Sequence, residues 1–90
     1  MTTPDRRRVA DEVIAVRVAD ETVAWHRVTG KLNLLDPIAT QVFERLDGRT
    51  TDEVVADLCS AFGAPSVVVQ LDVQALLAEL SDLGVLGPVA

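Results

Sequence analysis

Three short runs of strand-forming residues follow one another between residues 11 and 35, and their close spacing most constrains the fold. The runs are 11–18 (DEVIAVRV), 22–28 (TVAWHRV) and 31–35 (KLNLL). Their composition and partial alternation between two faces are typical of strands. The links between them, such as Thr29-Gly30, fit only tight turns, because parallel strands need a crossover of about a dozen residues or more. The sequence therefore predicts an antiparallel meander.

Helix signals begin directly after the third run. Asp36 and Pro37 are a typical N-cap and first helical residue, and Gly48 suits the end of that helix. Thr50 and Glu53 have the spacing of a capping box, which predicts the start of a second helix. Apolar residues at helical spacing predict the buried faces: Ile38, Ala39, Val42, Phe43 and Leu46 in the first helix, and Val54, Val55, Leu58 and Phe62 in the second.

A third helix is expected over 66–83, with Ser66 as its N-cap and Gly84 after its end. Its apolar residues occupy two neighbouring stripes, which is wider than one core face needs. They are Val69, Val73, Leu76, Leu77, Leu80 and Leu83.

The predicted order is therefore three strands followed by three helices. This is an α+β fold with a winged helix-turn-helix layout, in which a three-stranded antiparallel β-meander precedes three α-helices. Residues 1–10 (MTTPDRRRVA) offer little to bury, and we expect them to form a flexible N-terminal arm. Residues 11–87 then make up one domain, which suits a chain of 90 residues.

Composition excludes several classes of function. The chain has one cysteine and one histidine, Cys59 and His26, so it can form neither an internal disulfide nor a Cys/His metal cluster. No glycine-rich phosphate loop or nucleophile–base pair is evident, so we expect no catalytic residues, no cofactor and no enzyme activity. No apolar run approaches the ~20 residues of a membrane span, so we expect no membrane partner and a cytoplasmic location.

Charge separates the remaining hypotheses. Every Lys and Arg lies at or before Arg49, so the third helix offers acids and no bases to a partner. This argues against a winged-helix DNA-binding regulator and against nucleic acid as a partner. An edge strand beside an apolar helix suits a peptide that adds a strand to the sheet. An acidic interaction domain that forms a homodimer through the third strand is a further alternative.

An ordered set of short motifs resembles the PqqD-like family over residues 12–86. The matching residues are Leu32-Asn33, Ala39, Leu46-Asp47-Gly48-Arg49-Thr50, Glu53-Val54, Leu58, Phe62, Asp72-Val73, Leu76-Leu77, Leu80 and Gly84-Val85-Leu86. Leu76 departs from the family pattern, because this position is often aromatic.

The resemblance implies a non-catalytic recognition element for ribosomally made, modified peptides, with a winged helix-turn-helix fold. Such domains bind the leader segment of a precursor peptide as an added strand on the third strand, against the third helix. They present it to a maturation enzyme, such as a leader peptidase or a radical SAM enzyme. A chain of this size is similar to the discrete form found in lasso-peptide and quinone-cofactor pathways. The implied peptide-binding residues are Lys31, Leu32, Asn33, Leu34 and Leu35, with Val69, Asp72, Val73, Leu76 and Leu80 opposite them.

Overall fold

In the part of the chain that the structure describes, three antiparallel strands form one sheet in the order β1-β2-β3, and three helices follow it. The computed structural model describes residues 6–87. The element bounds are β1 (Val13–Val18), β2 (Glu21–His26), β3 (Leu32–Leu35), α1 (Pro37–Arg45), α2 (Thr51–Phe62) and α3 (Ser66–Asp82). The predicted α+β architecture and its meander are confirmed.

The β2–β3 hairpin is closed by a turn that begins earlier than predicted. The backbone N–H of Gly30 donates to the carbonyl of His26 (2.8 Å), and the N–H of Thr29 donates to Nδ1 of His26 (3.2 Å). Gly30 has a φ of 75°, which suits a residue without a Cβ. Because His26 is already the first residue of the turn, β2 ends there and not at Val28.

Side-chain caps begin α1 and α2 as predicted. Oδ1 of Asp36 accepts from the N–H of Ala39 (2.8 Å), and Thr50 and Glu53 make both bonds of a capping box. The predicted N-cap of α3 is wrong. Pro65 takes the extended N-cap conformation there and makes no side-chain cap, whereas Ser66 is already the first helical residue.

The core is aliphatic and lies between the inner face of the sheet and the three helices. Its buried side chains are Ala24, Leu35, Ala39, Val42, Leu46, Val54, Val55, Leu58, Val73, Leu77, Leu80, Val85 and Leu86. Packing between elements joins α1 to β2 and β3, and α2 to both α1 and α3. An ion pair between Arg17 of β1 and Glu44 of α1 also ties the sheet to that helix. The sheet is therefore held mainly by α1.

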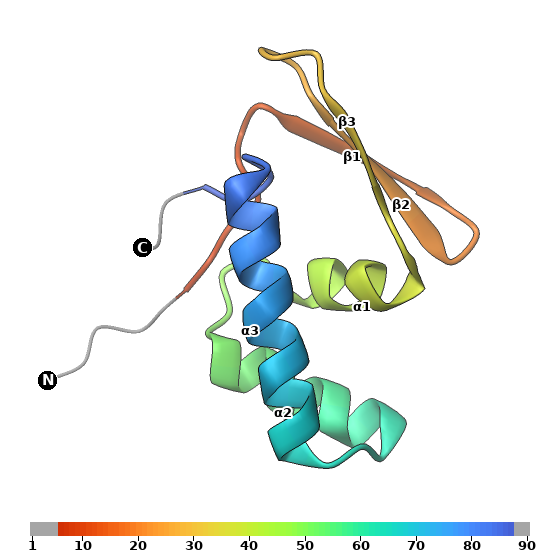
Figure 1. The fold of residues 1–90 in the computed structure, drawn as a ribbon, viewed down its shortest axis with the longest axis vertical. Helices are drawn as coiled ribbons and strands as arrows, with labels where there is room; N and C mark the ends of the chain where they lie inside the picture. The colour runs from red at the N-terminus through yellow and green to blue at the C-terminus, as the bar shows by residue number, and fades with distance from the viewer. Residues whose placement is uncertain (1–5, 88–90) are drawn as a thin grey trace, which may run out of the picture.

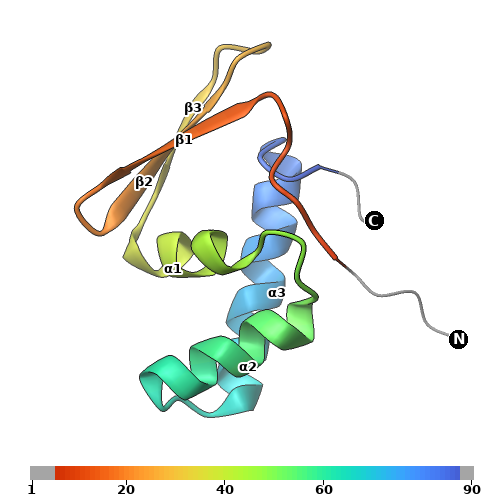
Figure 2. The same ribbon diagram turned by 180° about the vertical axis from the view of Figure 1, so that it is seen from behind.

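Figures 1 and 2 show the consequence for the shape of the molecule. The sheet extends away from the helices, and α1 lies at the base of an angle between β3 and α3. The chain leaves β3 at Leu35 and enters α1 at Pro37, so one residue links the two elements. This short link fixes α1 under the end of β3 and keeps the long helix α3 apart from the sheet.

The N-terminal segment differs from the arm predicted over residues 1–10. Residues 6–10 pair with two other parts of the chain, through bridges from Arg7 to Arg49 and from Val9 to Leu86. The N–H of Gly87 donates to the carbonyl of Arg8 (2.8 Å), which continues the second pairing. These backbone hydrogen bonds need no apolar side chains, so the polar composition of the segment did not indicate them. Residues 1–5 lie outside the described part of the chain.

The capping box makes one stability prediction. Hydrogen bonds from the backbone and the side chain of Thr50 lower the pKa of Glu53 from its ordinary value of 4.5, with smaller contributions from Arg6 and Arg49. A lowered pKa stabilises the fold above the unfolded-state value, and this stabilisation is lost as the pH falls through the folded-state value. We expect Glu53→Gln to unfold more easily than the wild type at neutral pH, and the two to converge below pH 4.5. Urea unfolding across this pH range measures the free energy of unfolding of both proteins. A difference between the two that stays constant into acid would contradict the prediction.

Candidate peptide-binding site

The free edge of β3 offers a short row of unpaired backbone groups. The N–H of His26 donates to the carbonyl of Lys31 (2.9 Å), which makes Lys31 a residue bonded to β2. Bonding alternates along an antiparallel ladder, so Asn33 and Leu35 also bond to β2. The N–H and C=O groups of Leu32 and Leu34 therefore point away from β2. Within residues 6–87, no strand pairs with this edge.

A cavity of about 280 Å³ lies between this edge and the C-terminal half of α3. The strand side contributes Asn33, Leu34 and Leu35, and the helix side contributes Leu76, Glu79, Leu80 and Leu83; Asp36 and Ala39 close it at the start of α1. We call this space the β3–α3 cavity. Leu35 and Leu80 belong to the core and form an apolar floor, whereas Glu79 is exposed. An extended chain placed here has backbone partners on one side and an apolar surface on the other.

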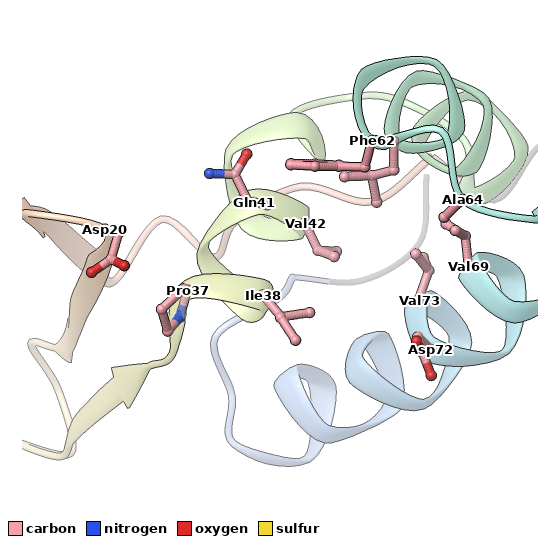
Figure 3. A pocket seen from close by; sticks show the side chains of 11 residues that line it. Asp20, Pro37, Ile38, Gln41, Val42, Phe62, Ala64, Val69, Asp72 and Val73 are labelled. Carbon is pink, nitrogen blue, oxygen red and sulfur yellow. The ribbon is translucent and has the colours of Figure 1, made fainter.

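A second cavity of about 480 Å³, the α1–α3 cavity, lies between α1, the end of α2 and the first turns of α3. Figure 3 shows Ile38 and Val42 of α1 facing Val69 and Val73 of α3 across it. The ring of Phe62 reaches over from the end of α2. Its lining residues are Asp20, Pro37, Ile38, Gln41, Val42, Leu58, Phe62, Ala64, Val69, Asp72 and Val73. This space is therefore mostly apolar, and it suits aliphatic or aromatic side chains.

The two cavities follow one another along α3, and we call them together the groove. Val73 lines the α1–α3 cavity, and Leu76, about one turn further along the helix, lines the β3–α3 cavity. On α1, the neighbouring residues Ile38 and Ala39 line one cavity each. Among the described residues, those that line the two cavities include four acids, Asp20, Asp36, Asp72 and Glu79, and neither Lys nor Arg.

The structure distributes the ten predicted site residues over three environments. Asn33, Leu34, Leu35, Leu76 and Leu80 line the β3–α3 cavity, and Val69, Asp72 and Val73 line the α1–α3 cavity. Lys31 and Leu32 line neither; Lys31 precedes β3, and the side chain of Leu32 is on the outer face of the sheet. The predicted set thus lies along one groove and on the strand beside it, and its role in binding stays a prediction.

Sequence reasoning missed the part of the groove contributed by α1 and α2. Ile38 and Phe62 were predicted to be buried, but they are 71% and 59% exposed. Ile38 lies one turn before the buried Val42 and shares its face of α1, so the apolar pattern did not show that Ile38 stays exposed. Phe62 has the correct phase, but it is the last residue of α2 and extends beyond the cover of the neighbouring helices.

The residues with catalytic potential are not gathered in this groove. His26 ends β2 and accepts a hydrogen bond from the β2–β3 turn, and Cys59 lies half-buried in α2 against the core. Residues 6–87 contain no group of three His, Cys, Asp or Glu side chains placed to hold a metal ion. Among the same residues, no helix has the length and apolar character to cross a membrane.

Comparison with known proteins identifies the family. The family model of PqqD, coenzyme PQQ synthesis protein D, matches residues 21–86. The chain belongs to the PqqD family. The match begins at the first residue of β2 and covers all three helices, so it includes both sides of the groove. A search of curated proteins gives no significant match.

Two solved structures share the fold of this PqqD-family chain. One is TbiB1 in complex with the TbiA(beta) leader peptide, which is 25% identical, with a TM-score of 0.84 over 92% of this chain and 98% of that chain. The other is a lasso peptide synthetase B1 complexed with the leader peptide, which is 23% identical, with a TM-score of 0.81 over 92% of this chain and 99% of that chain. The likeness thus extends over nearly the whole length of both chains.

The exposure of Phe62 makes a second stability prediction. Leu58, one turn earlier in α2, is 6% exposed, so Leu58→Ala should lower the free energy of unfolding by about 2–4 kcal/mol. Phe62→Ala should cost only ~1 kcal/mol, mainly through its contact with the guanidinium of Arg45, which lies 5.8 Å from the ring centroid. Urea unfolding of both variants measures this contrast. Equal losses would mean that Phe62 belongs to the core.

Proposed function

We propose that this PqqD-family chain recognises the leader segment of a ribosomally made precursor peptide and presents it to a maturation enzyme. The leader binds as an added strand on β3, in the groove along α3. The observation that carries the proposal is the position of the free edge of β3 beside an apolar cavity. Strand addition needs this combination, because backbone bonds provide affinity and side-chain pockets provide specificity.

The backbone of β3 determines how many hydrogen bonds an added strand can form. Leu32 and Leu34 each direct one N–H and one C=O group toward the edge, which allows four hydrogen bonds to an incoming strand. Each contributes about 0.5–1.5 kcal/mol net, so they do not by themselves provide tight binding. Apolar side chains of the leader that enter the β3–α3 and α1–α3 cavities supply the remainder. The leader should therefore combine a short extended segment with apolar anchors.

The relatives support the same ligand. Both solved structures contain a leader peptide, and both belong to proteins that match this chain over nearly its full length. The lasso peptide synthetase B1 structure favours a lasso-type pathway over a quinone-cofactor pathway. We further infer that the chain is non-catalytic, with a leader peptidase or a radical SAM enzyme as its maturation partner. Ribosomal synthesis of the precursor favours a cytoplasmic location.

The alternative of DNA binding is less well supported. The exposed charges of α3 are Asp72, Glu79 and Asp82, and this helix has no basic residue. A helix of this composition repels the phosphate backbone, which usually supplies most of the affinity for nucleic acid. Pairing of two copies through β3 would use the same edge as the leader. Dimerisation and leader binding would then compete. Sedimentation of the chain with and without leader shows whether a dimer forms and whether the leader dissociates it.

Leu34→Pro tests strand addition directly. Proline removes the N–H of Leu34, which points to the free edge, and leaves the bonds that join Asn33 and Leu35 to β2. We expect affinity for the leader of the precursor encoded beside this gene to fall by about tenfold, because one bond is lost and a carbonyl of the bound leader is left unpaired. Fluorescence anisotropy of the labelled leader measures it. Leu34→Ala is the matched control, because it shortens the same side chain and retains the N–H.

The unfolding free energy of each variant separates binding from folding. We expect Leu34→Pro to retain most of its stability, because Leu34 is 68% exposed and its N–H has no partner in the sheet. Unchanged affinity in a folded Leu34→Pro variant would exclude strand addition on β3. Absence of leader binding by the wild type would exclude the proposed function as a whole.

A further inference from the structure

The outer face of the sheet, on the side away from the helices, is apolar across all three strands. Cross-strand register aligns Ile14, Trp25 and Leu32 in one row and Val16, Val23 and Leu34 in the next. Val18 extends the face along β1. Their exposed fractions range from 41% for Trp25 to 68% for Leu32 and Leu34, and only Val23 is half-buried. We call these seven residues the outer face.

This composition is unusual for a sheet with one free side. The solvent-facing side of an antiparallel sheet normally carries polar residues at these positions, whereas all seven positions of the outer face are apolar. Among residues 6–87, the charged residues of this side of the sheet lie at the ends of the outer face. Glu12 and Arg27 pair beyond Ile14 and Trp25, where the N–H of Arg27 donates to the carbonyl of Glu12 (2.8 Å), and Glu21 lies opposite Val18. An apolar centre with a polar rim is the usual anatomy of a protein interface.

The size of the outer face limits what can occupy it. Three strands about 4.8 Å apart and about 20 Å long present roughly 300 Å². Two copies packed face to face would bury roughly 600 Å² in total, well below the ~1,200–2,000 Å² of a stable complex. The outer face is therefore too small to hold a homodimer by itself. A stable partner must therefore contact the outer face together with the surface beside it.

The neighbouring surface is the peptide site. Leu32 and Leu34 belong to the outer face through their side chains and to the free edge through their backbones. A leader strand added to β3 would become a fourth strand and would widen the face by about a third. Its own outward side chains would join the row that Leu32 and Leu34 begin. Occupied and empty domains thus differ in the surface they present, without any change in backbone conformation.

We propose that the outer face, widened by the bound leader, is the docking surface for the maturation enzyme, which contacts it through an apolar surface of its own. This inference rests on the proposed function. It predicts that the enzyme binds the leader-loaded domain more tightly than the empty one. By thermodynamic linkage, the enzyme must then tighten leader binding by the same factor.

Val16→Lys tests the docking surface. Val16 lies in β1, is 54% exposed and is separated by β2 from the strand to which the leader adds. Leu71→Lys is the matched control, because Leu71 is a similarly exposed apolar residue (63%) on α3. The probes are the labelled leader of the precursor encoded beside this gene and the purified maturation enzyme from the same gene cluster. Anisotropy measures leader binding, and calorimetry measures enzyme binding with and without saturating leader.

We expect the wild type to bind the enzyme at least fivefold more tightly when the leader is present. Val16→Lys should weaken enzyme binding at least tenfold and change leader affinity less than twofold, whereas Leu71→Lys should change neither. The emission of Trp25, the only tryptophan of the chain, should shift on docking. Circular dichroism verifies folding, and Val16→Thr, which keeps a β-branched side chain, provides a milder second variant.

Enzyme binding that is unchanged in both Val16 variants would overturn the docking surface and leave leader recognition intact. Equal enzyme affinity for the loaded and empty domains would overturn the contribution of the leader strand. A wild type that sediments as a dimer, with a monomeric Val16→Lys variant, would assign the outer face to a second copy and also overturn the proposal. Loss of leader binding in the wild type would instead overturn the proposed function.

Discussion

The junction between β3 and α1 is the constraint on which the rest of the structure depends. Asp36, the single residue between the two elements, caps α1 through the N–H of Ala39, and the hydroxyl of Thr40 donates to the carbonyl of Leu35 (3.2 Å). Both Thr40 and Leu35 are buried, so these bonds are shielded from water. They hold α1 against the inner face of the sheet. Because α1 occupies that position, α3 packs on α2 and stays apart from β3.

An open strand edge is also a hazard, and β3 is built in a way that limits it. The strand has four residues, and Pro37 follows it after one intervening residue. Short edge strands, proline and nearby charge are the usual means by which proteins avoid unwanted pairing between sheets. Lys31 before β3 and Asp36 after it supply the charge. The edge can therefore stay available to an extended peptide while long-range pairing with other sheets is disfavoured.

Local signals were enough to predict the strands and helices, but they did not show which apolar side chains the tertiary structure buries. The strands, the caps of Asp36 and Thr50 and the glycine at position 30 depend on interactions within a few residues, and the sequence shows them directly. Phe62 lies on the apolar stripe of α2, yet it is exposed, because the lengths of the neighbouring helices decide what covers the end of α2. The pairing of residues 6–10 with Arg49 and Leu86 likewise joins segments that are far apart in the chain.

The candidate site was predictable to a similar degree. The family resemblance predicted a site on β3 and one face of α3, and the two cavities are lined in part by these residues. It did not identify the contribution of α1, because Ile38 and Gln41 join the groove only when α1 is fixed under the end of β3. A sequence pattern shows which face of a helix or strand is apolar. Whether two such faces leave a groove between them depends on how far apart the tertiary structure holds them. That distance is set here by the single-residue link at Asp36.

Successive residues of β3 point their side chains alternately to the inner and the outer face of the sheet, and this alternation connects the groove with the outer face. Asn33 and Leu35 direct their side chains inward and their backbone groups toward β2, whereas Leu32 and Leu34 direct their side chains outward and their backbone groups toward the free edge. A strand that binds this edge must therefore lie in the same pleated surface as the outer face. Coupling between peptide and enzyme then needs no second conformation of the domain, in contrast to the usual two-state switch. It follows from geometry alone, because the ligand itself becomes part of the surface that the next partner contacts.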